Sequence, residues 1–195
     1  MSGSKPYHHG NLRSTLIEAG IELINHEGAE SFSLRRVCAR CGVSQTAPYS
    51  HFQNKEELLA AMQDYVTEQF MRQLRGAMAA VDDPNDPRVL VEMGKSYVMF
   101  FIRNPQYFAF LFSQPYMTVN LSLDADGTDN FPPYELVKSI VLRIFGGLPR
   151  QRLEDMIISL WATVHGLASI ATMKNVRYDK DWESKIEDII WNKEK

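Results

Sequence analysis

The sequence predicts an all-α fold of about nine helices, and three features support this prediction. Apolar residues recur at intervals of three and four along most of the chain, which is the period of a helix that packs on one face. Helix-ending signals separate these stretches, among them Gly28, Gly42, Gly146 and the DDPNDP segment at 82–87. We find no convincing strand pattern and no internal repeat.

The composition is typical of a soluble globular protein. Of the 195 residues, 45% are hydrophobic and 23% are charged. No apolar run approaches the roughly 18 residues that a membrane-spanning helix needs, and no apolar segment follows the first basic residue. We therefore expect a cytoplasmic protein with no secretory signal and no membrane partner.

The net charge of −3 is divided unevenly along the chain. Residues 1–55 carry a net charge of +2, with a cluster of Arg35, Arg36 and Arg40, and the remainder carries −5. A slightly basic head on an acidic body argues against a protein that coats nucleic acid non-specifically, because such a protein is basic throughout. The arginine cluster favours contact with phosphate over a merely solvated face.

The first residues predict an arm and a helix. Residues 1–10 are expected to form a flexible arm. Asn11 is a plausible N-cap for a helix that runs to about Glu27. Gly28 can end that helix in the left-handed conformation.

A tight turn joins the second and third predicted helices. Ser33 is placed to cap the second helix, and Gly42 supplies the positive φ that the turn needs. Ser44 can cap the third helix, of about two turns, by accepting from the N–H of Ala47. Pro48 is the fourth residue of that helix, where its missing N–H leaves only one carbonyl at the helix end unpaired.

The rest of the chain predicts further helices. Asn54 and Glu57 have the spacing of a capping box, and the helix that they open should end near Ala80. Residues 113–133 predict a long irregular connection. Helices are also predicted over residues 87–103, after the Asn104-Pro105 break, and over 134–145, 150–174 and 181–192.

A helix, a glycine turn and a short polar second helix form the shape that lays the start of that second helix along base edges in the major groove of DNA. Gln45 can pair with a base edge, and the methyl groups of Thr46 and Ala47 can touch thymine. Tyr49 and His51 can donate to phosphates. The predicted DNA-binding residues are Arg35, Ser44, Gln45, Thr46, Ala47, Tyr49, His51 and Lys55.

Residues 12–62 resemble the N-terminal domain of TetR-type transcriptional regulators. The resemblance covers about a quarter of the chain, and its combined pattern is highly specific. It is carried by Gly28, Phe32-Ser33-Leu34-Arg35, Val37-Cys38, Gly42-Val43-Ser44, Ala47-Pro48-Tyr49-Ser50-His51-Phe52 and Asn54-Lys55-Glu56-Glu57-Leu58-Leu59. The arm from Tyr7 to Arg13 and the stretch from Trp161 to Leu167 resemble a subgroup with a "WHG" C-terminal region.

The resemblance implies a homodimer, a ligand pocket in the C-terminal domain and repression that ligand binding relieves. It assigns residues 1–55 to DNA binding and residues 56–195 to ligand binding and dimerisation. Most of the predicted DNA-binding residues match positions where the family contacts DNA, namely Arg35, Gln45, Thr46, Tyr49, His51 and Lys55. Ser50 departs from the family, which often has a bulkier residue there.

Aromatic residues are dense in the second part of the chain. Most such residues belong to a core, but their density beside a long loop suggests a cavity for a small apolar or aromatic effector. The candidate ligand-binding residues are Tyr97, Phe101, Tyr107, Phe108, Phe112, Trp161 and His165. Small residues late in the 150–174 helix allow close helix approach, so the last two helices are expected to form the dimer. The candidate interface residues are Leu160, Val164, Leu167, Trp182, Ile186, Ile189 and Ile190.

Cys38 and Cys41 lie three residues apart on the expected buried face of a helix. This spacing favours two core residues over a redox pair or half of a zinc site. The sequence offers no nucleophile–base pair, no metal cluster and no phosphate-binding glycine loop. We therefore expect no catalytic residue, no metal and no cofactor.

The leading hypothesis is a ligand-responsive repressor that binds a palindromic operator as a homodimer and is released by a small apolar effector. An activator of the same fold, and a helical ligand-binding protein with no role at DNA, stay open as alternatives. The sequence names neither the effector nor the operator and target genes.

Overall fold

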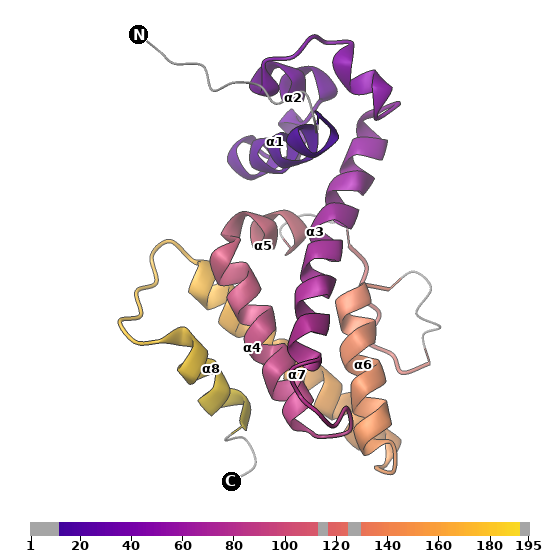
Figure 1. Cartoon of the computed structure of the whole chain (residues 1–195), viewed down its shortest axis with the longest axis vertical. Helices are drawn as coiled ribbons and strands as arrows, with labels where there is room; N and C mark the ends of the chain where they lie inside the picture. The colour runs from indigo at the N-terminus through magenta and orange to yellow at the C-terminus, as the bar shows by residue number, and fades with distance from the viewer. Residues whose placement is uncertain (1–11, 113–116, 125–129, 192–195) are drawn as a thin grey trace. The chain divides into compact units, whose positions relative to one another are not determined.

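The computed structural model describes residues 12–112, 117–124 and 130–191 (Figure 1). These residues form eight α-helices and two short 3-10 helices, with no strand among them. The predicted all-α class is confirmed, and the ninth predicted helix is one of the 3-10 helices. The predicted arm at 1–10 and the predicted cap Asn11 lie outside the described residues.

Contacts between residues divide the chain into two compact units, one ending at Tyr65 and the other beginning at Val66. The division falls within helix α3 (Lys55–Met78), so one helix belongs to both units. The functional boundary between residues 55 and 56 stays a prediction.

The first unit contains α1 (Leu12–Glu27), η1 (Ala29–Ser31), α2 (Leu34–Cys41), η2 (Ala47–Ser50) and the start of α3. Helices α1 and α2, the η2 turn and the start of α3 each contribute buried residues to one core, whereas η1 contributes none. Its most deeply buried side chains, at most 1% exposed, include Ile17, Val37, Phe52, Leu58 and Met62. Burying a side chain of this size contributes about 1.5–3 kcal/mol. This core holds the two helices and the turn between them in place.

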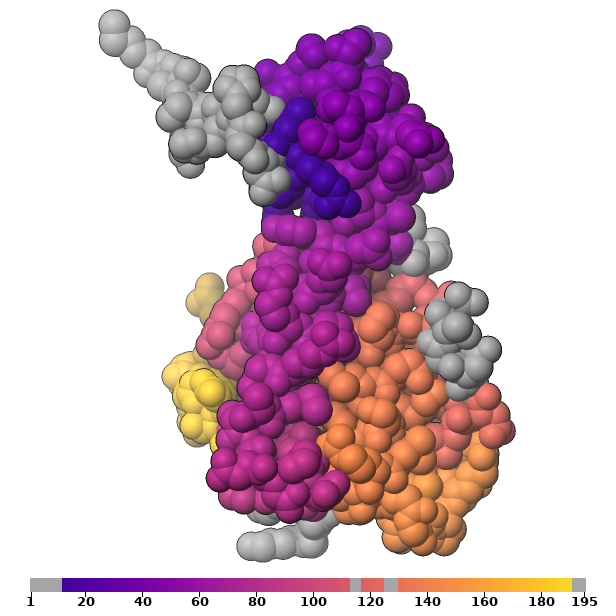
Figure 2. Space-filling view, turned by 45° about the vertical axis from the view of Figure 1, so that its right-hand side comes forward, coloured from indigo at the N-terminus to yellow at the C-terminus, as the bar shows by residue number. Residues whose placement is uncertain are grey.

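The second unit contains the rest of α3 with α4 (Arg88–Arg103), α5 (Pro105–Phe112), α6 (Pro132–Phe145), α7 (Arg150–Thr172) and α8 (Trp182–Trp191). Helix α4 packs against both α7 and α8, and α6 packs against α7. Figure 2 shows one face of this unit, on which α6 (orange) borders the later part of α3 (magenta). Helix α6 begins at Pro132, two residues earlier than expected, because proline is tolerated in the first turn of a helix.

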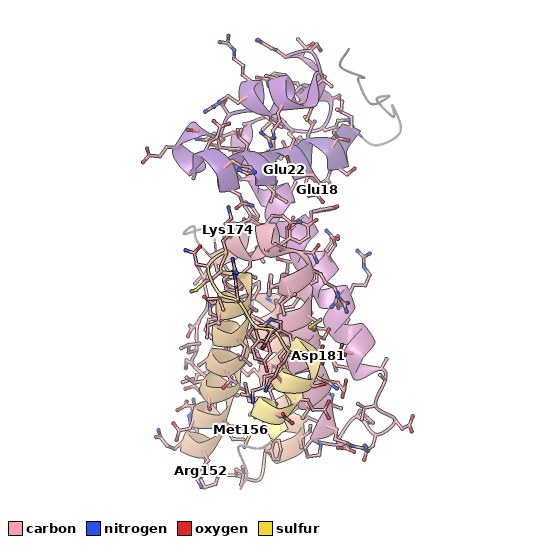
Figure 3. All side chains as sticks on the ribbon, turned by 90° about the vertical axis from the view of Figure 1, so that its left-hand side faces the viewer. Glu18, Glu22, Arg152, Met156, Lys174 and Asp181 are labelled. Carbon is pink, nitrogen blue, oxygen red and sulfur yellow. The ribbon has the colours of Figure 1, made fainter. Side chains whose placement is uncertain are left out.

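Helix α8 runs antiparallel to α7. In Figure 3, Arg152 and Met156 mark the first half of α7, Lys174 lies just after its end, and Asp181 precedes α8. An ion pair joins α8 to α4, with 3.0 Å between Lys95 Nζ and a Glu187 carboxylate oxygen. A Cβ atom at position 94 of α4 would collide with the Ile190 side chain, so a glycine there lets α8 approach closely.

Aromatic side chains form the centre of the second unit. Phe70 of α3 is fully buried, and its ring centroid lies 5.0, 4.9 and 4.8 Å from those of Tyr97, Phe100 and Phe101. Phe131, just before α6, approaches the same ring at 6.5 Å. Stacked, tilted and edge-to-face pairs at these distances are favourable beyond the area that they bury.

Candidate functional site

The turn between α2 and η2 has the backbone geometry that the sequence predicted. The Ser33 hydroxyl accepts from the N–H of Arg36 at 3.3 Å and so caps α2. Gly42 has φ 66° and ψ 28°, the left-handed conformation, and its N–H bonds back to Ala39 and Cys38. Gly28 also has positive φ, 82°, but its ψ of 160° differs from the left-handed helical conformation that was expected.

The segment after the turn differs from the expected helix of two turns. Its regular part is a single 3-10 turn, Ala47–Ser50. The N–H of Ala47 bonds to the backbone carbonyl of Ser44 at 3.1 Å, whereas the Ser44 hydroxyl lies 3.1 Å from that of Thr46, so the expected Ser44 side-chain cap is wrong. Pro48 has no N–H to offer the Ser44 carbonyl, which favours the tighter pattern of hydrogen bonds over three residues. Pro48 is therefore the second residue of this turn rather than the fourth.

A side-chain cap opens α3. The Asn54 side-chain oxygen accepts from the N–H of Glu57 at 2.8 Å. The Glu57 carboxylate reaches back to the N–H of Gln53 at 2.6 Å, one residue before the partner in a standard capping box. This arrangement fixes Lys55 in the first turn of α3, at the end of a helix that favours phosphate.

The predicted DNA-binding residues form an accessible set on the first unit. Tyr49 is 59% exposed, which is unusual for a large aromatic side chain. Ala47 is half-buried, and the others are exposed, namely Arg35, Ser44, Gln45, Thr46, His51 and Lys55. Between them, Pro48 and Phe52 are buried and anchor the segment. The Ser50 hydroxyl donates to the Ala47 carbonyl at 2.8 Å, so it is turned toward its own backbone.

The three arginines of α2 do not share one environment. Arg36 forms an ion pair with Glu27 and also donates to the Ser31 carbonyl. Arg40 forms an ion pair with Glu22 at 2.9 Å. Figure 3 shows Glu22 on α1, one turn after Glu18. Two of the three charges are thus matched within the unit, so the expectation that the whole cluster contacts phosphate now applies best to Arg35.

Residues 16–62 match the family model described as "Bacterial regulatory proteins, tetR family". The chain is 46% identical over 50 residues to the tetracycline repressor protein class G of Vibrio anguillarum, and 44% identical over 50 residues to the class C protein of Escherichia coli. The N-terminal domain is a TetR-family domain. These alignments cover 26% of this chain and 24% and 23% of the two relatives, so the chain matches about a quarter of their length.

Solved structures extend the likeness in fold beyond this TetR-family domain. A TetR-like transcriptional regulator from Rhodococcus sp. RHA1 superimposes with a TM-score of 0.65 at 16% identity, over 97% of each chain. A TetR-family transcriptional regulator from Haemophilus influenzae RD gives a TM-score of 0.63 at 16% identity, over 92% of this chain and 94% of that one. At such identities the comparison establishes the fold of the second unit and leaves its ligand open.

The two cysteines lie in the TetR-family domain. Cys38 is fully buried, and Cys41 is half-buried with its Sγ 3.7 Å from the Thr15 carbonyl oxygen. Burial, together with the neighbouring Cys38 and Glu22, raises the pKa of the Cys41 thiol from 9.0 to about 11. A raised pKa keeps the thiol protonated at neutral pH, which argues against a reactive pair.

Alkylation should therefore be slow at Cys41. At pH 8 we expect iodoacetamide to modify it roughly a hundredfold more slowly in the folded protein than in urea, because the thiolate fraction falls tenfold for each unit of pKa. Mass spectrometry can follow the two cysteines separately, since trypsin cleaves between them at Arg40. Equal rates in the folded and unfolded protein would show that Cys41 is accessible and ordinary.

The second unit contains a cavity of about 40 Å³ between α3, α4, α6, α7 and α8. Its wall is mainly apolar and includes Leu74, Met93, Val164 and Ile190. This volume exceeds the roughly 10–15 Å³ that one water needs. It is well below the roughly 150 Å³ of a cavity that holds benzene. A ligand of more than a few atoms would therefore have to move part of the wall.

The predicted ligand-binding residues meet around His165. The Tyr97 hydroxyl lies 3.2 Å from His165 Nδ1, and the rings of Phe108, Phe112 and Trp161 lie 5.2, 4.6 and 5.6 Å from the imidazole. Burial lowers the pKa of His165, so its imidazole is neutral at neutral pH.

Only two of the seven predicted ligand-binding residues, Tyr97 and Trp161, line the cavity itself. The other predicted aromatic residues pack into the adjoining core. The contribution of α6 was not predicted from the sequence, yet its residues Pro133, Tyr134 and Val137 line the cavity. An aromatic residue in the first turn of a helix after a long loop was the one available signal.

The predicted dimer residues fall into three environments. Ile186 and Val164 are buried within the chain. Leu160 and Ile190, with Val164, line the cavity. Leu167, Trp182 and Ile189 are half-buried. A role for these seven residues in a dimer stays a prediction.

No group of three or more metal-ligating side chains is present in the part of the chain that the structure describes. Among the same residues, α7 has the length and composition of a membrane-spanning helix, which is weak evidence when one helix alone has them.

Proposed function

We propose that this protein is a ligand-responsive transcriptional regulator, a repressor that binds an inverted-repeat operator as a homodimer. The observation that carries the proposal is the exposed set around Tyr49, held on a short turn directly after the left-handed Gly42 in a TetR-family domain. Exposed polar and aromatic side chains on a rigid turn suit base and phosphate contacts in a major groove.

An apolar face on α7 supports the homodimer. Ile158 is 41% exposed and Ile170 is 45% exposed. Between them Ser159, Ala162 and Gly166 fall on the same side of the helix, as spacings of three and four residues require. In the most apolar stretch of α7, only 17% of the residues are buried.

A second copy is a better partner for this face than a membrane. Helix α7 is already packed by its other side, through buried Leu153, Ile157 and Ala168. Small residues flanked by isoleucines let two helices approach closely, and one twofold contact would bury the same face in both copies. We place the centre of the proposed dimer at Gly166.

Helix α3 supplies a physical connection for the ligand response. It begins at Lys55, beside the DNA-binding residues, and its Leu74 lines the cavity. A ligand that moves Leu74 can therefore bias the position of α3. The two DNA-binding domains of the proposed dimer would then favour a separation that no longer fits the operator.

A gel-shift titration with DNA from upstream of its own gene tests the proposal directly. We expect a specific, salt-sensitive complex on an inverted repeat whose half-sites lie about one helical turn apart. If a scan of upstream DNA yields only weak binding without sequence preference, the regulator proposal is wrong.

Two substitutions should separate phosphate contact from base reading. Lys55→Ala is expected to weaken binding to all sequences alike and to reduce the salt slope by about one. Gln45→Ala is expected to relax the preference at one base pair per half-site, by about 1–3 kcal/mol. Filter binding at several salt concentrations, on the operator and on single-base variants of it, measures both effects.

Lys180→Ala provides the matched control, because it removes the same charge from an exposed residue outside the TetR-family domain. It should leave both the affinity and the salt slope unchanged. A Lys55→Ala protein that behaves like this control would remove Lys55 from the interface.

A further inference from the structure

We propose that the cavity of the second unit takes a neutral, mainly apolar ligand with one hydrogen-bond acceptor, bound by the indole N–H of Trp161. The proposal deepens the ligand response above and rests on that proposed function for its biological role. The binding chemistry itself is independent of DNA.

The carrying observation is an unpaired polar atom on a residue that lines the cavity. Trp161 lines the cavity, and its Nε1 is buried with no hydrogen-bond partner among the described residues. The ring is held by Tyr134 and by His165, each with its ring centroid 5.6 Å from that of Trp161. A buried donor without a partner is unfavourable. A ligand whose acceptor atom hydrogen-bonds to this N–H would therefore be stabilised.

The other polar groups at this point are already engaged with each other. The Tyr97 hydroxyl pairs with His165 Nδ1, and a neutral imidazole can accept that hydrogen. Burial raises the pKa of Tyr97, against a smaller lowering by the neighbouring Trp161. The indole and the Tyr97 hydroxyl are thus near each other, but without the geometry of a hydrogen bond. The Trp161 N–H is the donor left for a ligand.

The rest of the cavity wall disfavours a charged ligand. The side chains that line the cavity include none with a formal charge among the described residues. A carboxylate or an ammonium group would lose its hydration here with no counter-charge to replace it. Ketones, esters and similar neutral acceptors on an apolar body fit this wall.

Because the cavity is small, a ring-sized ligand must displace part of its wall, and Ile190 is the candidate. Ile190 of α8 lines the cavity and is half-buried, whereas Tyr97, Phe131 and Tyr134 in the same wall are buried. Ile190 occupies the space that the absent side chain of Gly94 leaves open. A ring-sized ligand would enter by displacing Ile190 and the end of α8.

The test compares two probes of the same shape on the full-length protein. Cyclohexanone carries a carbonyl acceptor, and methylenecyclohexane replaces the oxygen with a CH₂ group. The protein has three tryptophans, so indole labelling with ¹⁵N gives few signals, and Trp161→Phe identifies the one of interest. We expect cyclohexanone to move the Trp161 N–H proton downfield and to bind roughly three- to tenfold more tightly than methylenecyclohexane.

The Trp161→Phe protein should bind both probes with equal affinity. Cyclohexylammonium and cyclohexanecarboxylate should bind at least tenfold more weakly than cyclohexanone. The proposal is overturned by equal affinity of the two neutral probes for the wild-type protein, by stronger binding of a charged probe, or by binding of neither neutral probe.

If Trp161→Phe does not fold, the affinity ratio in the wild-type protein still decides between these outcomes. Operator binding is measured separately by gel shift. Loss of the regulator proposal would therefore leave the probe result standing, and failure of the probes would leave DNA binding untouched.

Discussion

Replacing Gly166 with leucine is expected to convert the proposed dimer into folded monomers. A Cβ atom at Gly166 would meet no atom within 4 Å in the protomer, so the larger side chain has room in the single chain. Leucine also has a helix propensity better than that of glycine by about 0.8–1 kcal/mol. In a dimer centred on Gly166 the same side chain would hold two α7 helices apart. Sedimentation velocity and circular dichroism measure the assembly and the helix content.

Operator binding should fall with the dimer. Two linked recognition units gain a roughly 10²–10⁴-fold advantage over one when both half-sites are engaged. We expect Gly166→Leu to weaken operator binding by at least about a hundredfold at protein concentrations where the wild type is dimeric.

Gly76→Leu is the matched control for this substitution. Gly76 is exposed and Gly166 is half-buried, but both lie inside long α-helices, and a Cβ atom at either position would meet nothing within 4 Å. It should stay dimeric and retain operator binding. A Gly166→Leu protein that remains a dimer would place the interface elsewhere, with the predicted Trp182 and Ile189 as the next residues to test.

The features that sequence could predict are those that depend on close neighbours in the chain. The Ser33 cap, the left-handed Gly42 and the pairing of Asn54 with Glu57 each involve residues no more than four apart. Backbone sterics and short side-chain hydrogen bonds decide such features, so their residue types reveal them. The helix boundaries near Glu27 and Arg103 follow from the same kind of local signal.

The features that sequence could not predict depend on partners far along the chain. Arg40 pairs with Glu22, eighteen residues earlier, and nothing in the local pattern distinguishes it from the exposed Arg35. The cavity is lined from five helices, so its wall could not be separated from its surrounding core by composition. The 3-10 turn at Ala47–Ser50 was predicted as a helix of about two turns. The missing N–H of Pro48 is compatible with the start of such a helix, but it also favours a 3-10 turn.

Aromatic side chains show this limit most clearly. The sequence predicts Tyr49 as a phosphate contact, but it does not show which aromatic rings meet around Phe70. Tyr49 is 59% exposed, whereas Phe70 is fully buried among four other rings. Tyr49 therefore lies on the surface, where it is accessible to a partner, and Phe70 belongs to the core of the second unit.

Phe70→Ala is expected to destabilise the second unit by about 3–5 kcal/mol, because it removes buried surface and leaves a cavity that its neighbours fill only in part. The free energy of unfolding can be measured by urea titration at fixed protein concentration, since the proposed dimerisation would make the apparent stability concentration-dependent. All three tryptophans lie after residue 66, so their fluorescence reports on this unit.

Tyr49→Ala supplies the opposite pattern for comparison. An exposed residue away from the core should change the unfolding free energy by no more than about 0.5 kcal/mol, while operator affinity falls. Phe70→Leu, which keeps most of the apolar volume, should lie between Phe70→Ala and the wild type. A Phe70→Ala protein as stable as the wild type would mean that the aromatic cluster is not the core of this unit. The proposed path from cavity to α3 would then lose its rigid support, because Leu74 is positioned by the helix turn that Phe70 anchors.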